Sequence, residues 1–168
     1  MNSHHSKPSA QEAEKILFKL YHLKGKAFRL PGFVDFNFKI VIDGETQYIL
    51  KISRENSNNK LRFLLQDILI YLEKVSTDLM IPQIISDQNG NFTSEICNGN
   101  KKQTVRLLSW VSGRIWNDVN PRLDKLHYSL GETCGKLTRA LLNFKHSEAH
   151  GKFEWDTANA LWTLEHNH

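Results

Sequence analysis

The chain has 168 residues and a mass of 19.5 kDa, the size of one ordinary domain or of two small lobes. Apolar residues make up 40% and charged residues 24%, which is typical of a globular protein and excludes a disordered chain. The formal charge of +4 comes from basic residues that form no run or stripe, and this argues against nucleic acid as the partner.

The small number of cysteines and the lack of long apolar segments indicate where in the cell the protein works. Cys97 and Cys134 are too few for a disulfide framework or a zinc site. The first ten residues, MNSHHSKPSA, lack the apolar segment of a signal peptide, and Gln66 and Asp67 interrupt the long apolar run over 64–72. We therefore expect a cytoplasmic protein in a reducing compartment, without a membrane-spanning segment.

The first half of the chain carries both helix and strand signals. Residues 1–8 are polar and are predicted to form a disordered tail. Ser9 and Glu12 have the spacing of a capping box, which begins an amphipathic helix. Period-two alternation, with turns at Pro31-Gly32 and Asp43-Gly44, predicts three strands, and a broad apolar stripe then predicts a second helix. In chain order, the expected ranges are 10–23 (helix), 27–30, 36–42 and 47–52 (strands), and 60–75 (helix).

The second half continues the sheet and then becomes helical. Turn residues and alternation predict strands over 83–86, 92–97 and 104–111, and helices are expected over 122–144 and 156–165. Cys134 lies on the apolar line of the first of these helices and is interpreted as a small core residue. The order predicts an α+β fold, with a small antiparallel sheet carrying a helix and then an all-helical segment. We expect the chain to divide near residue 113, into a first part over 9–113 and a helical part over 114–168.

Lys51 is the charged residue with the most unusual surroundings, since it lies within the apolar strand sequence Tyr48-Ile49-Leu50-Lys51-Ile52. A buried ammonium is costly unless an anion meets it. One interpretation is a lysine on the solvent face of an edge strand, where it discourages aggregation. The other is a lysine that binds an anion. The preceding hairpin, the long amphipathic helix after it and the later strand ending at Gly113 favour the second.

This arrangement resembles the N-terminal lobe of protein-kinase-like folds, and more closely the aminoglycoside phosphotransferase family, with its choline-kinase-like, homoserine-kinase-like and hydroxylysine-kinase-like members. LPGFVDFNF at 30–38 is similar to the D-x-N-F start of a strand in that family. YILKI at 48–52 is similar to its Y-V-L-K-I, and VRLLSWVSG at 105–113 to its hinge strand. Further similarities, to the opening of its helical lobe, are at Leu130-Gly131, Phe144-Lys145-His146 and Trp155-Asp156. The resemblance covers about residues 15–165, and the chain also resembles the heads of bacterial proteins that continue into a class-III aminotransferase.

The resemblance implies an ATP- and Mg²⁺-dependent phosphotransferase acting on a small-molecule hydroxyl. The strand lysine would contact the α and β phosphates, and an apolar residue before it would touch the adenine. Backbone groups of the hinge would meet the adenine edge, and the first turn would lie over the phosphates. The implied nucleotide-binding residues are Lys51, Ile49, Ser109, Trp110, Val111, Phe33 and Asp35. From the residues alone, the apolar residue could instead be core, the hinge strand an ordinary central strand, and the first turn a simple connection.

Two departures from the family pattern concern charged groups. The second helix of such a lobe normally supplies a Glu to the strand lysine, but Leu64-Leu65-Gln66-Asp67 contains none, and Asp67 is the nearest acid. No histidine begins an H-x-D-x-x-x-x-N catalytic loop, so we assign no catalytic residue and no metal ligand. His146 and His150 have the spacing of a zinc pair but no evident third ligand, and a surface loop is the preferred interpretation.

We therefore expect the chain to be the nucleotide-binding portion of a small-molecule kinase whose catalytic loop is missing here. The alternative is a non-catalytic, pseudokinase-like module for ligand sensing or protein interaction, and a weaker third possibility is a basic adaptor for RNA. The expected partners are a nucleotide and an unidentified hydroxyl acceptor, with no nucleic acid and no membrane. Apolar surface left by an incomplete helical lobe predicts self-association or contact with a fused downstream domain.

Overall fold

A computed structural model describes residues 7–32, 34–54, 59–75, 78–98 and 101–150. Most of the tail expected over residues 1–8, the turn residue Phe33 and the helix expected over 156–165 lie outside these ranges. Each other predicted helix and strand is present, with ends that differ by a few residues. The elements are α1 (Ala10–Tyr21), β1 (Lys26–Leu30), β2 (Asp35–Ile42), β3 (Glu45–Ser53), α2 (Asn59–Val75), β4 (Ile84–Ile85), β5 (Ser94–Asn98), β6 (Lys101–Ser109) and α3 (Asp124–Leu141).

The strands form one antiparallel sheet in the order β1-β2-β3-β6-β4, with β5 also paired to β6. Hairpins join β1 to β2 and β2 to β3. The other neighbour of β3 is β6, which follows much later in the sequence, after α2. The β2–β3 turn has the left-handed residues Asp43 and Gly44, as the sequence predicts. This pairing puts β3 at the centre of the sheet, which excludes the edge-strand interpretation of Lys51.

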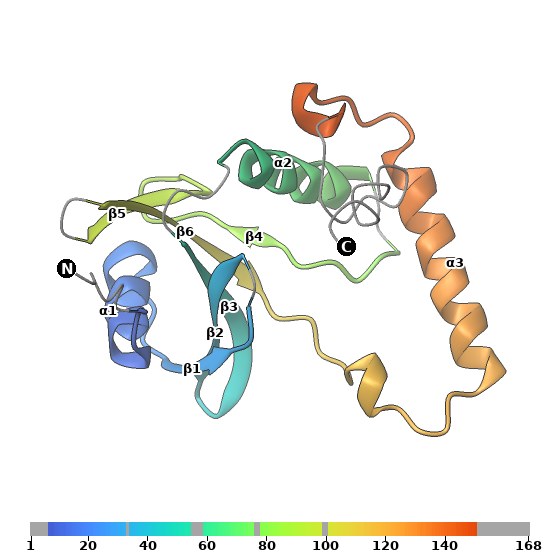
Figure 1. The fold of residues 1–168 in the computed structure, drawn as a ribbon, viewed down its shortest axis with the longest axis horizontal. Helices are drawn as coiled ribbons and strands as arrows, with labels where there is room; N and C mark the ends of the chain where they lie inside the picture. The colour runs from blue at the N-terminus through green and yellow to red at the C-terminus, as the bar shows by residue number, and fades with distance from the viewer. Residues whose placement is uncertain (1–6, 33, 55–58, 76–77, 99–100, 151–168) are drawn as a thin grey trace, which may run out of the picture.

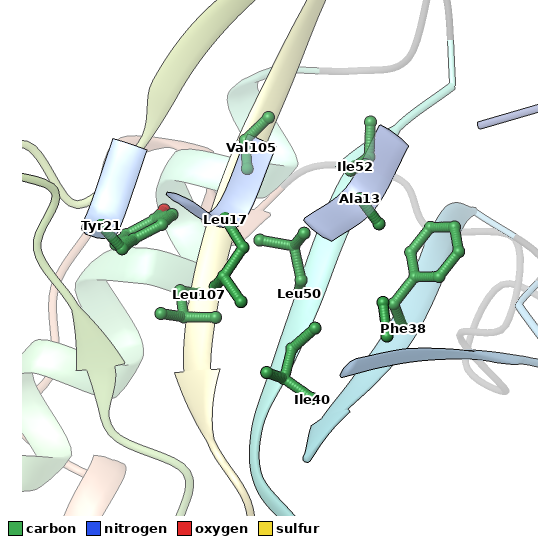
Figure 2. Packing of buried hydrophobic residues seen from close by; sticks show 10 residues of the cluster. Ala13, Leu17, Tyr21, Phe38, Ile40, Leu50, Ile52, Val105 and Leu107 are labelled. Atoms are coloured by element: carbon green, nitrogen blue, oxygen red, sulfur yellow. The ribbon is translucent and has the colours of Figure 1, made fainter. Parts of the chain in front are cut away.

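The apolar core lies between α1 and one face of the sheet (Figure 1). Figure 2 shows side chains of β2, β3 and β6 directed toward those of α1. The core consists of Ala13, Leu17, Tyr21, Ala27, Phe38, Ile40, Leu50, Ile52, Val105 and Leu107. Because successive strand residues point to opposite faces, the neighbours of these residues in sequence project from the other side of the sheet, toward α2. The chemistry-bearing residues lie on that second face.

The start of α1 has the predicted capping box. The Ser9 hydroxyl accepts from the Glu12 backbone at 3.2 Å, and the Glu12 carboxylate accepts from the Ser9 backbone at 2.7 Å. The helix ends at Tyr21, two residues before the predicted end, and is capped by His22, which has a left-handed φ of 53°. Glu14 also accepts from the Ala27 backbone at 3.1 Å, which ties α1 to the first strand of the sheet.

The interpretation of Cys134 as a core residue is wrong, because its side chain is exposed. None of the residues of α3 is buried, and Leu130 and Leu137 of its apolar line are 47% and 37% exposed. Figure 1 shows α3 extending away from the sheet, with one end beside α2. A helix with an uncovered apolar line is typical of one layer of a larger helical assembly.

A few polar and aromatic contacts hold α3 and the segment after it beside α2. Lys136 on α3 lies 3.5 Å from Asp78, and His146 lies 3.3 Å from Asp67 of α2. The rings of Tyr71 and Phe144 are 5.1 Å apart between centroids. These contacts are mostly exposed, so they fix the helical segment much more weakly than the core fixes α1.

We expect Phe38→Ala to lower the free energy of unfolding by about 3–5 kcal/mol, because Phe38 is fully buried beneath α1 and its removal leaves a cavity. Phe28→Ala, on the neighbouring strand, is the matched control, since Phe28 is 50% exposed and its loss should cost about 1 kcal/mol or less. Urea unfolding followed by circular dichroism measures both. Equal losses in the two variants would contradict the placement of the core.

Candidate functional site

Lys51 lies near the middle of β3, on the face of the sheet turned away from α1. Asn37 of β2 and Arg106 of β6 are its direct cross-strand partners, and its side chain is half-buried. Residues paired in this way have Cβ atoms about 4.5–5.5 Å apart. Two like charges, Lys51 and Arg106, therefore face each other across the centre of the sheet. Such a pair is destabilising unless negative charge lies close by.

The negative charge comes from Asp35, the first residue of β2, which is 5% exposed. Its Oδ1 accepts from Arg62 at 3.0 Å, and its Oδ2 accepts from Arg106 at 3.1 Å. Arg62 and Arg106 are as deeply buried as the carboxylate. One carboxylate therefore ties the start of β2, the first part of α2 and the middle of β6 together, and we call these three residues the Asp35 bridge.

Arg62 is placed against the usual preference of a helix. It lies in the first part of α2, where the helix dipole disfavours positive charge, and the first turn contains no acid. The Asp35 carboxylate compensates for this unfavourable position. Arg106 also donates to the Arg62 backbone carbonyl at 3.4 Å, which connects α2 to β6 a second time.

Among the described residues, three cations, Lys51, Arg62 and Arg106, lie around the one Asp35 carboxylate. Burial lowers the pKa of Lys51 most, and the two arginines lower it further, although Asp35 acts in the opposite direction. Burial also lowers the pKa of Arg106. Within the described residues, the Lys51 ammonium makes no ion pair or hydrogen bond. An anion bound at Lys51 would favour its ammonium form.

The acids of α2 contact other groups and not Lys51. Asp67, the acid nearest the expected position, lies 3.3 Å from the His146 ring. Glu73 accepts from the Gln83 side chain at 3.4 Å. The helix acid that the family pattern would provide is therefore absent from the surroundings of Lys51 in the described part of the chain.

The first turn is held close to β2. Asn37 donates to the Pro31 carbonyl at 3.1 Å, and Arg54 donates to the Gly32 carbonyl at 3.0 Å. A side chain at Gly32 would overlap the Asp35 carbonyl and the Asn37 amide, so this position needs glycine. The turn is thus more than a loose connection, and it leads directly into Asp35. Phe33 is outside the described residues.

Ser109 ends β6, and Trp110 and Val111 follow it; the resemblance predicts that these three residues form a hinge. The Ser109 N–H donates to the Gln83 carbonyl and the Trp110 N–H to the Gln47 carbonyl, both at 2.8 Å. Among the described residues, the Val111 N–H has no such acceptor. Backbone groups of these residues are predicted to meet an adenine edge, and of their three N–H groups that of Val111 has no acceptor among the described residues. A groove of about 560 Å³ lies beside the hinge, between it and the segment before β4.

Ile49 lies two residues before Lys51 on the same face and is half-buried opposite Leu108. It is therefore outside the α1 core, and its contact with a base stays a prediction. The structure brings Ile49, Lys51 and Asp35 to one face and places the hinge at the end of β6. Sequence reasoning missed Arg62 and Arg106, although Arg106, like Lys51, is a cation inside an apolar strand.

Metal ligands do not gather on the described residues. Histidine, cysteine and carboxylate side chains nowhere form a group of three that could hold a metal ion there. Nor does any described helix combine the length and apolar character that a membrane span needs. The prediction that this chain supplies no catalytic residue remains a prediction.

Comparison with known proteins supports the fold. No family model and no curated protein matches the sequence. The structure is similar to that of amicoumacin kinase hAmiN in complex with AMP-PNP, Ca²⁺ and Ami, with a TM-score of 0.65 and 18% identity over 83% of this chain and 42% of that one. It is also similar to a microcompartment-associated aminopropanol kinase, with a TM-score of 0.64 and 16% identity over 88% of this chain and 45% of that one. The chain has the fold of a small-molecule kinase over less than half the length of either enzyme.

We expect Asp35→Asn to lower the free energy of unfolding by about 3–5 kcal/mol, because it leaves buried arginines without their counter-ion. Asp43→Asn is the control, since Asp43 is exposed in a left-handed turn that asparagine also adopts, and it should change stability by about 0.5 kcal/mol or less. Urea unfolding of the two variants measures the difference. A loss at Asp35 no greater than that at Asp43 would contradict a structural role for the bridge.

Proposed function

We propose that the chain is the nucleotide-binding portion of an ATP-dependent phosphotransferase that acts on a small-molecule hydroxyl. One observation carries the proposal: a half-buried lysine that makes no ion pair with a described residue lies beside two arginines, at the centre of the sheet of a small-molecule-kinase fold. A phosphate chain is the anion that such a fold would bring to this face. Lysine suits the task, since its ammonium is a compact point charge.

Lys51 would contact the α and β phosphates. The central strand β3 is paired on both sides, so the lysine backbone is held rigidly, and binding would cost little ordering there. Asp35 is fully committed to Arg62 and Arg106, which makes it a poor ligand for Mg²⁺. We infer that Mg²⁺ arrives with ATP as part of the substrate and is not held in a preformed site on these residues.

The base would lie between Ile49 and the hinge. Ile49 offers an apolar surface on the same face as Lys51, and the Val111 N–H offers one donor to the edge of a purine. Because the Ser109 and Trp110 N–H groups are used in the sheet, the base would be read with few hydrogen bonds. We therefore expect the phosphates to dominate the binding free energy.

A second candidate function is a non-catalytic module that binds a nucleotide without transferring phosphate. The acids of α2 contact His146 and Gln83 and not Lys51, and this departure from the kinase pattern favours the second candidate. Both functions require the same Lys51 site, and they differ only in turnover. Assay of the full-length native protein for ATP consumption with small hydroxyl and amino-alcohol compounds separates them.

Lys51→Met tests the nucleotide site. We expect Mg-ATP to raise the melting temperature of the unaltered protein, since a ligand at a hundred times its Kd stabilises the folded state by about 2.7 kcal/mol. In Lys51→Met the Mg-ATP shift should disappear. The ligand-free variant should melt at a higher temperature than the unaltered protein, because its folded state no longer holds a partly desolvated, crowded ammonium.

Lys102→Met is the matched control, because Lys102 is exposed and pairs only with the exposed Glu95 at 3.3 Å. It should keep the Mg-ATP shift. An equal shift in Lys51→Met and the unaltered protein would exclude a phosphate role for Lys51. No shift in the unaltered protein at millimolar Mg-ATP would exclude the nucleotide site itself.

A further inference from the structure

The counter-ion of the Lys51 ammonium is not one of the acids of α2. In the described part of the chain, α2 offers Asp67 and Glu73, and both contact other partners, His146 and Gln83. The residue that α2 directs into this region is instead a cation, Arg62. The helix therefore contributes the opposite charge to the one that a strand lysine requires.

We propose that Asp35 takes the place of a helix acid as the counter-ion that positions the Lys51 ammonium for a phosphate, and that Arg62 couples this arrangement to α2. The proposal deepens the proposed function and rests on it for the phosphate. Asp35 is a positioning residue here, since its oxygens are occupied by arginines and it does not contact the ligand.

Register puts Asp35 near Lys51 without pairing them directly. Asp35 lies opposite Ser53, and Asn37, two residues further along β2, lies opposite Lys51. Diagonal neighbours of this kind are about 7–8 Å apart, close enough for a strong interaction between charges that are shielded from water. Among the described residues, the charged groups that act on the Lys51 ammonium are Asp35 from β2, Arg106 from β6 and Arg62 from α2, and of these three Asp35 alone favours the ammonium form.

The two arginines hold the carboxylate in place. Each donates to a different oxygen of Asp35, at 3.0 and 3.1 Å, so the carboxylate can neither rotate nor approach Lys51 to form a direct pair. Its charge therefore acts on Lys51 from a fixed position and leaves the ammonium available to a ligand. Because one of the two arginines belongs to α2, displacement of that helix would release the carboxylate and change the charge that Lys51 experiences.

The experiment is an NMR titration of the lysine ε-methylene groups in the ligand-free protein. We expect Asp35→Asn to lower the pKa of Lys51, and each unit of lowering reduces the ratio of charged to neutral lysine about tenfold. Arg106→Met breaks the same Asp35–Arg106 ion pair but removes a cation that faces Lys51, so it should raise that pKa. A purely structural bridge would move the pKa in the same direction in both variants, and that result, or no change in Asp35→Asn, would overturn the proposal.

If Asp35→Asn alone does not fold, the same substitution can be tested in the Arg106→Met protein. Arg106→Met removes one buried cation, so adding Asp35→Asn to it leaves fewer uncompensated charges. The double variant should show a lower Lys51 pKa than Arg106→Met alone, and an equal or higher pKa would overturn the proposal.

The link to phosphate has its own readout. Mg-ATP affinity of the unaltered protein should fall as the pH rises through the folded-state pKa of Lys51, because the ammonium is lost. In Asp35→Asn, or in the double variant compared with Arg106→Met, the fall should begin at a lower pH. A fall at the same pH would overturn the positioning role. Complete absence of Mg-ATP binding would instead refute the proposed function, while the ligand-free titration would still decide whether Asp35 is the counter-ion.

Discussion

The buried Asp35 carboxylate, shared by Arg62 and Arg106, is the interaction on which this face of the sheet depends. Its two partners lie 27 and 71 positions further along the sequence. The bridge therefore connects the start of β2, the first part of α2 and the middle of β6. Buried ions are costly to desolvate, so such a bridge is retained only where its geometry is good and its partners are complete. Both oxygens have a partner here, which makes the bridge a fixed reference point for the side chains around it.

Lys51 is the residue beside the Asp35 bridge whose charge is the least favourable energetically. The sheet would be more stable with an apolar residue at this position, since the lysine is partly desolvated and lies opposite Arg106 in the β3–β6 pair. The proposed function explains why a fold would keep such a lysine, because a bound phosphate would supply the negative charge that no described residue brings into contact with Lys51. The α1 core on the opposite face provides the stability that this charge cluster does not.

Local patterns in the sequence were sufficient for most of the fold. Alternation gave the strands, Asp43-Gly44 the hairpin and Ser9 with Glu12 the helix start, because each of these depends on neighbouring residues. Lys51 could be singled out because a cation in an apolar strand is unusual. The Asp35 bridge could not be predicted, since it joins distant residues through pairings that no local pattern encodes. Cys134 was misplaced because an apolar line on a helix indicates which face is to be covered, and not what covers it.

The most direct test of the account is the spectrum of ε-¹³C-labelled lysines, recorded before and after addition of Mg-AMP-PNP. Lys51 should show the largest change among the lysines, and its pKa should rise on binding, because the phosphates compensate the positive charge around it. Lys39 lies on the same face, two residues along β2 from the cross-strand partner of Lys51, and should change little. An unchanged Lys51 resonance at saturating nucleotide would contradict the account.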